Sequence, residues 1–240
     1  MADNNGLVLN DNDNGTQSAI WTPVEEITPD QKVLIGTVDP LSGNMVASWD
    51  PLVVSENNAT FAATPSTRFS AAKNLKSISI PNGVTTMDGF SSYTALETVS
   101  IPNGVTAIGS YANCTSLTEI NIPDSVTSLE DGAFHGCSSL ESITIPASVK
   151  TIGESAFGSC TSLKNVILSE GIETLGGRGV FNGCTALESI TIPSTVTSIG
   201  NYCFSYCSNL ETITINKAED SISGAPWGAP ETTQIIWAGE

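Results

Sequence analysis

The chain has 240 residues, 40% of them hydrophobic, and 8 Lys and Arg stand against 25 Asp and Glu, which gives a formal net charge of −17 at pH 7. This balance argues against binding to nucleic acid or to an anionic membrane surface, because both need clustered Lys and Arg. No run of about 18 apolar residues occurs, so we expect no membrane insertion. The single histidine argues against a multi-His metal site and against His-based catalysis.

Residues 1–18 are rich in Asn, Asp and Gly, and they lack the basic and apolar regions of a secretory signal. The run Asp11–Gly15 invites comparison with a calcium loop. However, EF-hand spacing places neutral asparagines at the ligand positions before Gly15, and Trp21 at the position that requires Glu. We therefore expect a flexible, solvated tail here.

Residues 19–66 show no repeat. Lys32–Val38 and Met45–Trp49 are predicted strands around a turn, and Leu52–Val54 and Ala59–Ala63 form a second predicted pair. We interpret the segment as an N-terminal cap of β-hairpins that covers the open edge of the first repeat, since so short a segment has a marginal core of its own. The alternative is an attachment module that joins the chain to a larger assembly.

Residues 67–227 repeat with a period of 21 to 24 residues. Aliphatic residues stand three and five positions after each of seven leucines, and Pro follows the second aliphatic in five of the seven units. An aromatic residue stands six positions before each leucine, and in the last five units Cys stands three before it. The leucines are Leu75, Leu96, Leu117, Leu140, Leu163, Leu187 and Leu210, and the aromatics are Phe69, Phe90, Tyr111, Phe134, Phe157, Phe181 and Phe204.

The pattern predicts a solenoid with one strand per turn. In Ile143-Thr144-Ile145 the alternation is that of a strand with one buried face, and stacked turns would place such strands about 4.8 Å apart in a parallel sheet. Val149 and Ile152 typify a second aliphatic pair, which faces inward from the opposite wall. We expect the Ala-Phe-x-x-Cys stretch to form a short helical or 3₁₀ turn, and the aromatics to form a ladder between the walls.

The repeat pattern continues past Leu210, since Ile222 and Trp227 keep the positions of Ile152 and Phe157. We therefore expect residues 228–240 to form a C-terminal cap, with a final strand over Thr233–Trp237. Modified terminal repeats are typical of solenoids, because the end of the stack must cover apolar surface.

The unit CTSLxxIxIPxxVTxIGxxAF, present at Cys160–Ile172 and at Cys184–Phe204, resembles the BspA-like leucine-rich repeats of bacterial surface antigens. The resemblance implies a curved leucine-rich-repeat solenoid that binds host or partner proteins without catalysis, in a cell-surface or secreted protein. Similar arrays occur in phage tail-associated proteins, and the SGAPWGAP segment at residues 223–230 is similar to the way some of those arrays end.

The cysteines and the histidine are interpreted as structural. Five cysteines on consecutive turns have parallel Cβ vectors, which disfavours disulfides and suits small buried residues with a weak donor. Cys203 and Cys207 are the close pair, but the sequence supplies no further zinc ligands. We expect His135 to be exposed, and we expect no cofactor and no metal. No repeat-placed carboxylate pair points to an enzyme, so a hydrolase is the least favoured interpretation.

The outward face of the predicted strands suggests a recognition surface. Ser or Thr stands four positions after five of the seven leucines, and Glu stands one position after four of them. Ile167 interrupts the polar column between Thr144 and Thr191, with Lys164 beside it, while Arg178 is predicted to project from the longest bend. These five residues are the candidate partner-binding residues, although drift between repeats also accounts for Ile167.

The sequence supports three hypotheses of function. The first is a recognition or adhesion module that binds a protein or a glycan through the open sheet face, at the cell surface or outside the cell. The second is a virion component, such as a phage tail or receptor-binding protein, and the third is the hydrolase. A surface module is expected to be a monomer and a virion component an oligomer, so oligomeric state separates the first two.

Overall fold

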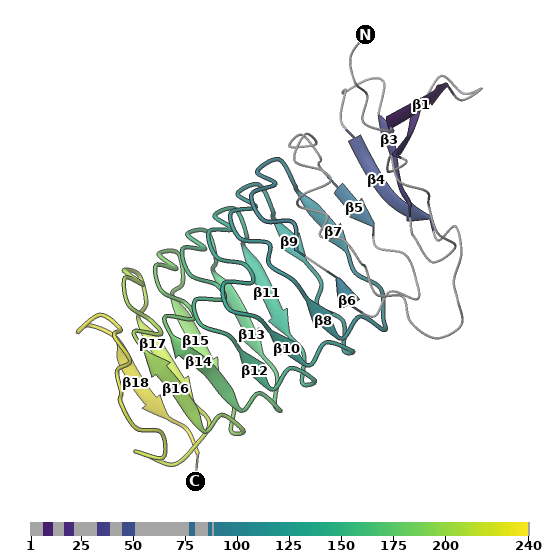
Figure 1. Cartoon of the computed structure of the whole chain (residues 1–240). Coiled ribbons are helices and arrows are strands. Elements are labelled where there is room, and N and C mark those ends of the chain that lie inside the picture. Colours follow the sequence, from purple (N-terminus) through teal and green to yellow (C-terminus); the bar gives the residue numbers. More distant parts are fainter. Residues whose placement is uncertain are drawn as a thin grey trace.

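The computed structural model describes residues 89–239 and, before them, the strand segments 7–11, 17–21, 33–38, 45–50, 77–79 and 86–87. In these residues the chain winds into a solenoid whose turns stack along one axis, from the N-terminal strands to β18 (Figure 1). The predicted solenoid is therefore confirmed.

The first wall of the solenoid consists of parallel strands, one from each turn. Equivalent residues pair in register, for example Thr144 with Ile167 and Ile190 with Ile213. The hydrogen-bonded ladder is interrupted between β9 and β11 and between β13 and β15, but these strands remain side by side. The strands are β5 (Ser77–Ser79), β7 (Thr98–Ser100), β9 (Glu119–Ile120), β11 (Ser142–Ile145), β13 (Asn165–Leu168), β15 (Ser189–Ile192), β17 (Thr212–Ile215) and β18 (Gln234–Trp237).

The second wall is a parallel sheet on the opposite side of each turn, with two residues in each of its first four strands and more in its last two (Figure 1). Leu129 pairs with Ile152, and Ile152 pairs with Leu175, so the second aliphatic pair of the repeat stacks as predicted. Its strands are β6 (Thr86–Met87), β8 (Ala107–Ile108), β10 (Ser128–Leu129), β12 (Thr151–Ile152), β14 (Thr174–Arg178) and β16 (Ser198–Asn201).

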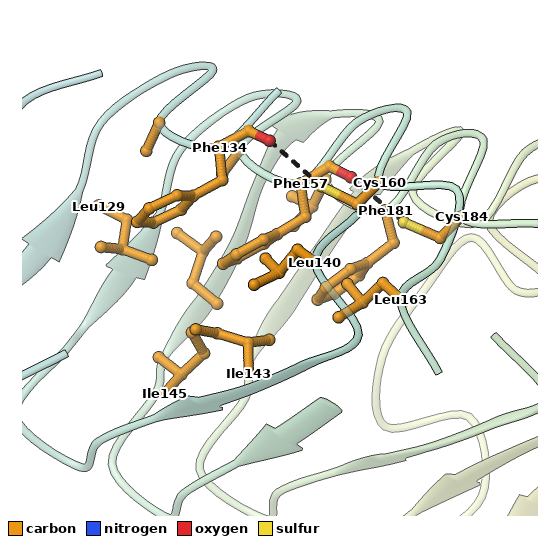
Figure 2. Packing of buried hydrophobic residues seen from close by; sticks show 14 of the residues in the cluster. Leu129, Phe134, Leu140, Ile143, Ile145, Phe157, Cys160, Leu163, Phe181 and Cys184 are labelled. Atoms are coloured by element: carbon orange, nitrogen blue, oxygen red, sulfur yellow. Dashed lines mark hydrogen bonds between the residues drawn. The ribbon is translucent and has the colours of Figure 1, made fainter. Parts of the chain in front are cut away.

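The core fills the space between the two walls with columns of equivalent side chains. Every repeat leucine from Leu96 to Leu210 is buried, as are the inward aliphatics Val149 and Ile152. The rings of Tyr111 through Phe204 stack turn upon turn, with centroids 5.4–6.0 Å apart and interplanar angles of 3–12°. Figure 2 shows Phe134, Phe157 and Phe181 aligned in this way. The predicted aromatic ladder is confirmed.

The bends that carry the aromatics contain no helix anywhere in residues 89–239, so the expected helical or 3₁₀ turn is wrong. Around Phe134 the chain instead forms successive tight turns, in which the amide of His135 donates to Gly132 and that of Cys137 donates to Phe134. Gly132 and Gly136, two residues before and after the ring, have φ values of +64° and +73°. These left-handed residues interrupt the right-handed backbone that a 3₁₀ turn requires.

The bends are also tied to one another along the axis. The amide of Phe134 donates to the carbonyl of Ala156 in the next turn, at 2.7 Å, and that of Phe157 donates to Val180 at 2.9 Å. In the first wall the direction is reversed, since the amide of Lys164 donates back to Glu141. Each turn therefore satisfies the backbone groups of both neighbours on two sides of the coil.

The N-terminal strands form an antiparallel meander that extends the first wall. It consists of β1 (Leu7–Asp11), β2 (Gln17–Trp21), β3 (Val33–Val38) and β4 (Met45–Asp50), and β4 pairs in parallel with β5. The strands expected at Lys32–Val38 and Met45–Trp49 are present as β3 and β4, and the meander overlaps the segment interpreted as a cap, residues 19–66, but begins before it. The tail expected at 1–18 instead contains β1, which includes Asn10 and Asp11, and the start of β2. Residues 12–15, whose types favour turns, come between the two strands in the sequence. The pair predicted at 52–54 and 59–63 lies outside the described residues.

The C-terminal end closes the stack as predicted, with one shift. Strand β18 pairs in parallel with β17, and Ile222 and Trp227 are buried. In the preceding turns, the backbone amide of the aromatic residue donates to the carbonyl of the residue that comes before the aromatic of the next turn, as Phe181 does to Cys203. The amide of Phe204, in contrast, donates to the carbonyl of Trp227 itself. The terminal turn is therefore offset by one residue from the repeat pattern.

We predict that Phe157→Ala lowers the free energy of unfolding by about 3–5 kcal/mol, because it leaves a cavity between the rings of Phe134 and Phe181. Urea unfolding followed by circular dichroism measures the loss. The exposed Thr144 of the same region provides the control, since Thr144→Ala should change stability by less than about 0.5 kcal/mol. Equal stability of the Phe157 variant and the wild type would contradict the ladder.

Candidate functional site

The outer face of the first wall brings together three of the predicted site residues. Thr144 and Ile167 are register partners on β11 and β13, and Thr191 lies at the equivalent position of the adjacent strand β15. All three are exposed, and 59% of Ile167 is accessible to solvent. Ile236 on β18 takes the same position beside Thr214 and is 45% exposed, so a second apolar side chain lies in the Thr column.

A charged column runs beside the Thr column on this face. Glu141, Lys164, Glu188 and Glu211 are all exposed, one from each successive turn. Their backbones are tied together, because the amide of Lys164 donates to Glu141 at 2.9 Å and the amide of Glu211 donates to Glu188 at 2.8 Å. Lys164 thus places one positive charge within an acidic column, in the same turn as Ile167.

Arg178 does not belong to this surface. It is exposed at the end of β14 in the second wall, where it pairs with Asn201 of β16, and the bend begins directly after it. The additional residue of this turn is absorbed by a register shift between Leu175 and Arg178. The five predicted residues therefore divide into four on the sheet face and one on the opposite side of the coil.

Arg178 instead lines a groove at the bends near the C-terminal end. Its guanidinium carbon lies 4.9 Å from the ring centroid of Tyr202, and Tyr206 lies in the same groove. Tyr202 is 53% exposed and Tyr206 is 78% exposed. The groove has a volume of about 670 Å³ and is lined by Glu154, Ser155, Arg178, Gly179, Asn182, Tyr202, Ser205, Tyr206 and Gly228.

Neither tyrosine was predicted as a site residue from the sequence, although both differ from the residues at the same positions of neighbouring turns. They stand two residues before and after Phe204, where the turns from Phe134 to Phe181 have only Gly or Ser. A comparison of bend positions, in addition to core positions, would have singled out this turn.

Five of the six cysteines form a structural column, as predicted. All six are buried and free. The Sγ of Cys160 donates to the carbonyl oxygen of Phe134 and that of Cys184 donates to Phe157, both at 3.2 Å, as Figure 2 shows. Burial raises the pKa of Cys114, Cys160 and Cys207 to about 12, so the thiols stay protonated and can donate.

The carboxylates of the described residues serve structural roles where they make contacts. Glu170 accepts hydrogen bonds from the Ser194 amide at 3.1 Å and the Ser194 hydroxyl at 2.8 Å, and the amide bond is the main cause that lowers the pKa of Glu170. His135 is exposed, as expected. Across the part of the chain that the structure describes, no three His, Cys, Asp or Glu side chains come together as a metal site would require. Nor does this part contain a helix able to cross a membrane.

The repeats match a known family along most of the chain. A family model described as the BspA type leucine rich repeat region matches residues 56–112 and 88–211. The chain belongs to the BspA-type leucine-rich repeat family. No curated protein matches it by sequence.

Solved structures of bacterial leucine-rich repeat proteins have the same fold as this BspA-type chain. A leucine rich cell surface protein from Faecalibacterium prausnitzii is 27% identical with a TM-score of 0.59, and the match covers 81% of this chain and 55% of that one. The chain thus spans about half the length of that protein. The T. pallidum leucine rich repeat protein (24% identity, TM-score 0.55, 82% and 87% coverage) and one from Bacteroides ovatus (22%, 0.56, 90% and 71%) support the fold.

The buried thiols of the repeats make the free energy of unfolding decrease as the pH rises into the alkaline range. An unfolded thiol titrates near pH 8.5, whereas the folded Cys160 holds its proton to about pH 12. Its contribution is therefore full below about pH 8.5 and is lost as the pH rises toward 12, because the unfolded state releases the proton first. In the wild type, the free energy of unfolding should fall between pH 9 and 11 with a slope that includes the proton released by Cys160 on unfolding. We predict that Cys160→Ala makes this slope shallower by the contribution of nearly one released proton.

Urea unfolding at closely spaced pH values measures this slope. Thr144→Ala, which removes no titrating group, should keep the slope of the wild type. An unchanged slope in the Cys160 variant would contradict the burial of a protonated thiol at this position.

Proposed function

We propose that the chain is a non-enzymatic recognition and adhesion module of a bacterial cell-surface or secreted protein, which binds a protein or glycan partner through the outer face of the first wall. The observation that carries this proposal is the exposed Thr column with Ile167 in it. A side chain of this size that is 59% exposed on a regular strand contributes little to the stability of the fold.

The geometry of the wall suits binding by many contacts on a rigid support. The backbones of Thr144 and Ile167 are fixed by the parallel ladder, so little order has to be gained when a partner binds. Ile167 supplies an apolar centre, and the surrounding Thr hydroxyls supply a polar rim, which is the usual arrangement of a binding hot spot.

The charge of the face indicates the kind of partner. Glu141, Glu188 and Glu211 are exposed on consecutive or nearby turns, and the chain as a whole carries a net charge of −17. Such a surface attracts a basic partner and speeds its encounter at low ionic strength. The similarity to a cell surface protein of Faecalibacterium prausnitzii supports a location outside the cell.

We predict that Ile167→Asp weakens binding to intact epithelial cells by about tenfold or more, because it places a desolvated charge at the centre of the interface. Fluorescently labelled protein and flow cytometry give the apparent Kd. Protease-treated and glycosidase-treated cells distinguish a protein partner from a glycan partner.

Thr151→Asp is the matched control, since Thr151 is exposed on β12 of the second wall and should leave this binding unchanged. Equal binding by wild type and Ile167→Asp would contradict the sheet face as the binding surface.

A further inference from the structure

The turn around Phe204 departs from its neighbours at two positions of the bend. The residue two positions before the aromatic has a positive φ in each of these turns: +64° at Gly132, +53° at Ser155 and +62° at Gly179. In the turn of Phe204 this position is occupied by Tyr202, with φ of +59°. The residue two after the aromatic is Tyr206 at +61°, where the other turns have Ser92, Asn113, Gly136, Ser159 and Gly183. The left-handed conformation is unfavourable for a bulky side chain, so the backbone does not account for either tyrosine.

Packing does not account for Tyr206 either, and the ring of Tyr202 packs against the Arg178 guanidinium. Most of Tyr206 and about half of Tyr202 face solvent. Among the described residues the Tyr206 ring has no ring or cation contact, and neither phenol hydroxyl makes a hydrogen bond. A bulky side chain that occupies an unfavourable backbone conformation and adds no stabilising contact indicates a binding role.

The surroundings of the two rings supply hydrogen-bonding groups of both kinds. The Glu154 carboxylate accepts and the Arg178 guanidinium donates, while Asn182 and Ser205 do both, and all four line the same groove of about 670 Å³. Arg178 is held over the Tyr202 ring, which fixes its direction. The groove thus combines aromatic surfaces with convergent polar groups, as binding pockets do.

We propose that this groove is a carbohydrate-binding subsite for a neutral hexopyranose unit of an oligosaccharide. A pyranose ring has an apolar C–H face, which packs on an aromatic ring, and an edge of hydroxyl groups that each donate and accept hydrogen bonds. Tyr206 provides the aromatic ring, and the polar side chains of the groove form hydrogen bonds with the sugar hydroxyls. These side chains are Glu154, Arg178, Asn182 and Ser205. Opposite charges on Glu154 and Arg178 favour a neutral sugar over an anionic one. An extended peptide would need apolar pockets that this lining does not provide.

The site is separate from the outer face of the first wall, so the two proposals can fail independently. Saturation-transfer NMR of the full chain with lactose, chitotriose and maltotriose as probes tests the subsite. We expect transfer to the ring C–H protons of at least one probe, its loss in Tyr206→Gly, and its retention in Ile167→Asp. Because Gly suits the left-handed position, Tyr206→Gly should melt at the same or a higher temperature than the wild type.

Four results would overturn the proposal. One is the absence of transfer to every probe, and another is equal transfer in the wild type and Tyr206→Gly. The third is a marked drop in the melting temperature of Tyr206→Gly, which would show that the ring has a structural role. Transfer to a proline-rich peptide in place of the sugars would also assign the groove to a different class of ligand.

Discussion

The structure depends on the stacking of equivalent residues from one turn to the next. A single turn of 21 to 24 residues encloses too little apolar volume to be stable alone, so its leucine, aliphatic and aromatic side chains are buried only by those of the turns on either side. The backbone imposes the same condition, since the amides of Phe134 and Phe157 find their acceptors in the following turn. The cysteine column adds a third link, because each Sγ–H reaches an aromatic residue's carbonyl in the preceding turn.

This arrangement separates the residues that hold the fold from those that are free to bind. Inward positions are fixed by their neighbours along the axis, whereas an outward position can change without disturbing the stack. Ile167 on the first wall, and Tyr202 and Tyr206 at the bends, occupy such outward positions and differ from their equivalents in other turns. Under both proposals, specificity resides where the repeat is broken at the surface, while the core remains regular.

The core could be predicted from the sequence because the same pattern of core residues occurs in seven repeats. The columns of Leu140, Ile152 and Phe157 follow from spacing alone, and so does the burial of Cys160. The bends were less predictable, since an Ala-Phe-x-x-Cys stretch suits a helical turn until the two left-handed residues around the ring are known.

The candidate site was only half predictable for a related reason. Thr144, Ile167, Thr191 and Lys164 are placed by strand alternation, which the sequence displays directly. The wall to which Arg178 belongs depends on how three nearby glycines absorb one additional residue, and the structure does so by a register shift within β14. Tyr202 and Tyr206 require knowledge of backbone conformation at the bends, which hydrophobic periodicity does not carry.

The most direct test of in-register stacking is a nuclear Overhauser measurement between the aromatic rings in a sample with labelled Phe. The account predicts cross-peaks between Phe134 and Phe157 and between Phe157 and Phe181, whose ring centroids lie 5.4 Å and 5.6 Å apart, and none between Phe134 and Phe181. Absence of the two adjacent cross-peaks, or a direct one between Phe134 and Phe181, would contradict it.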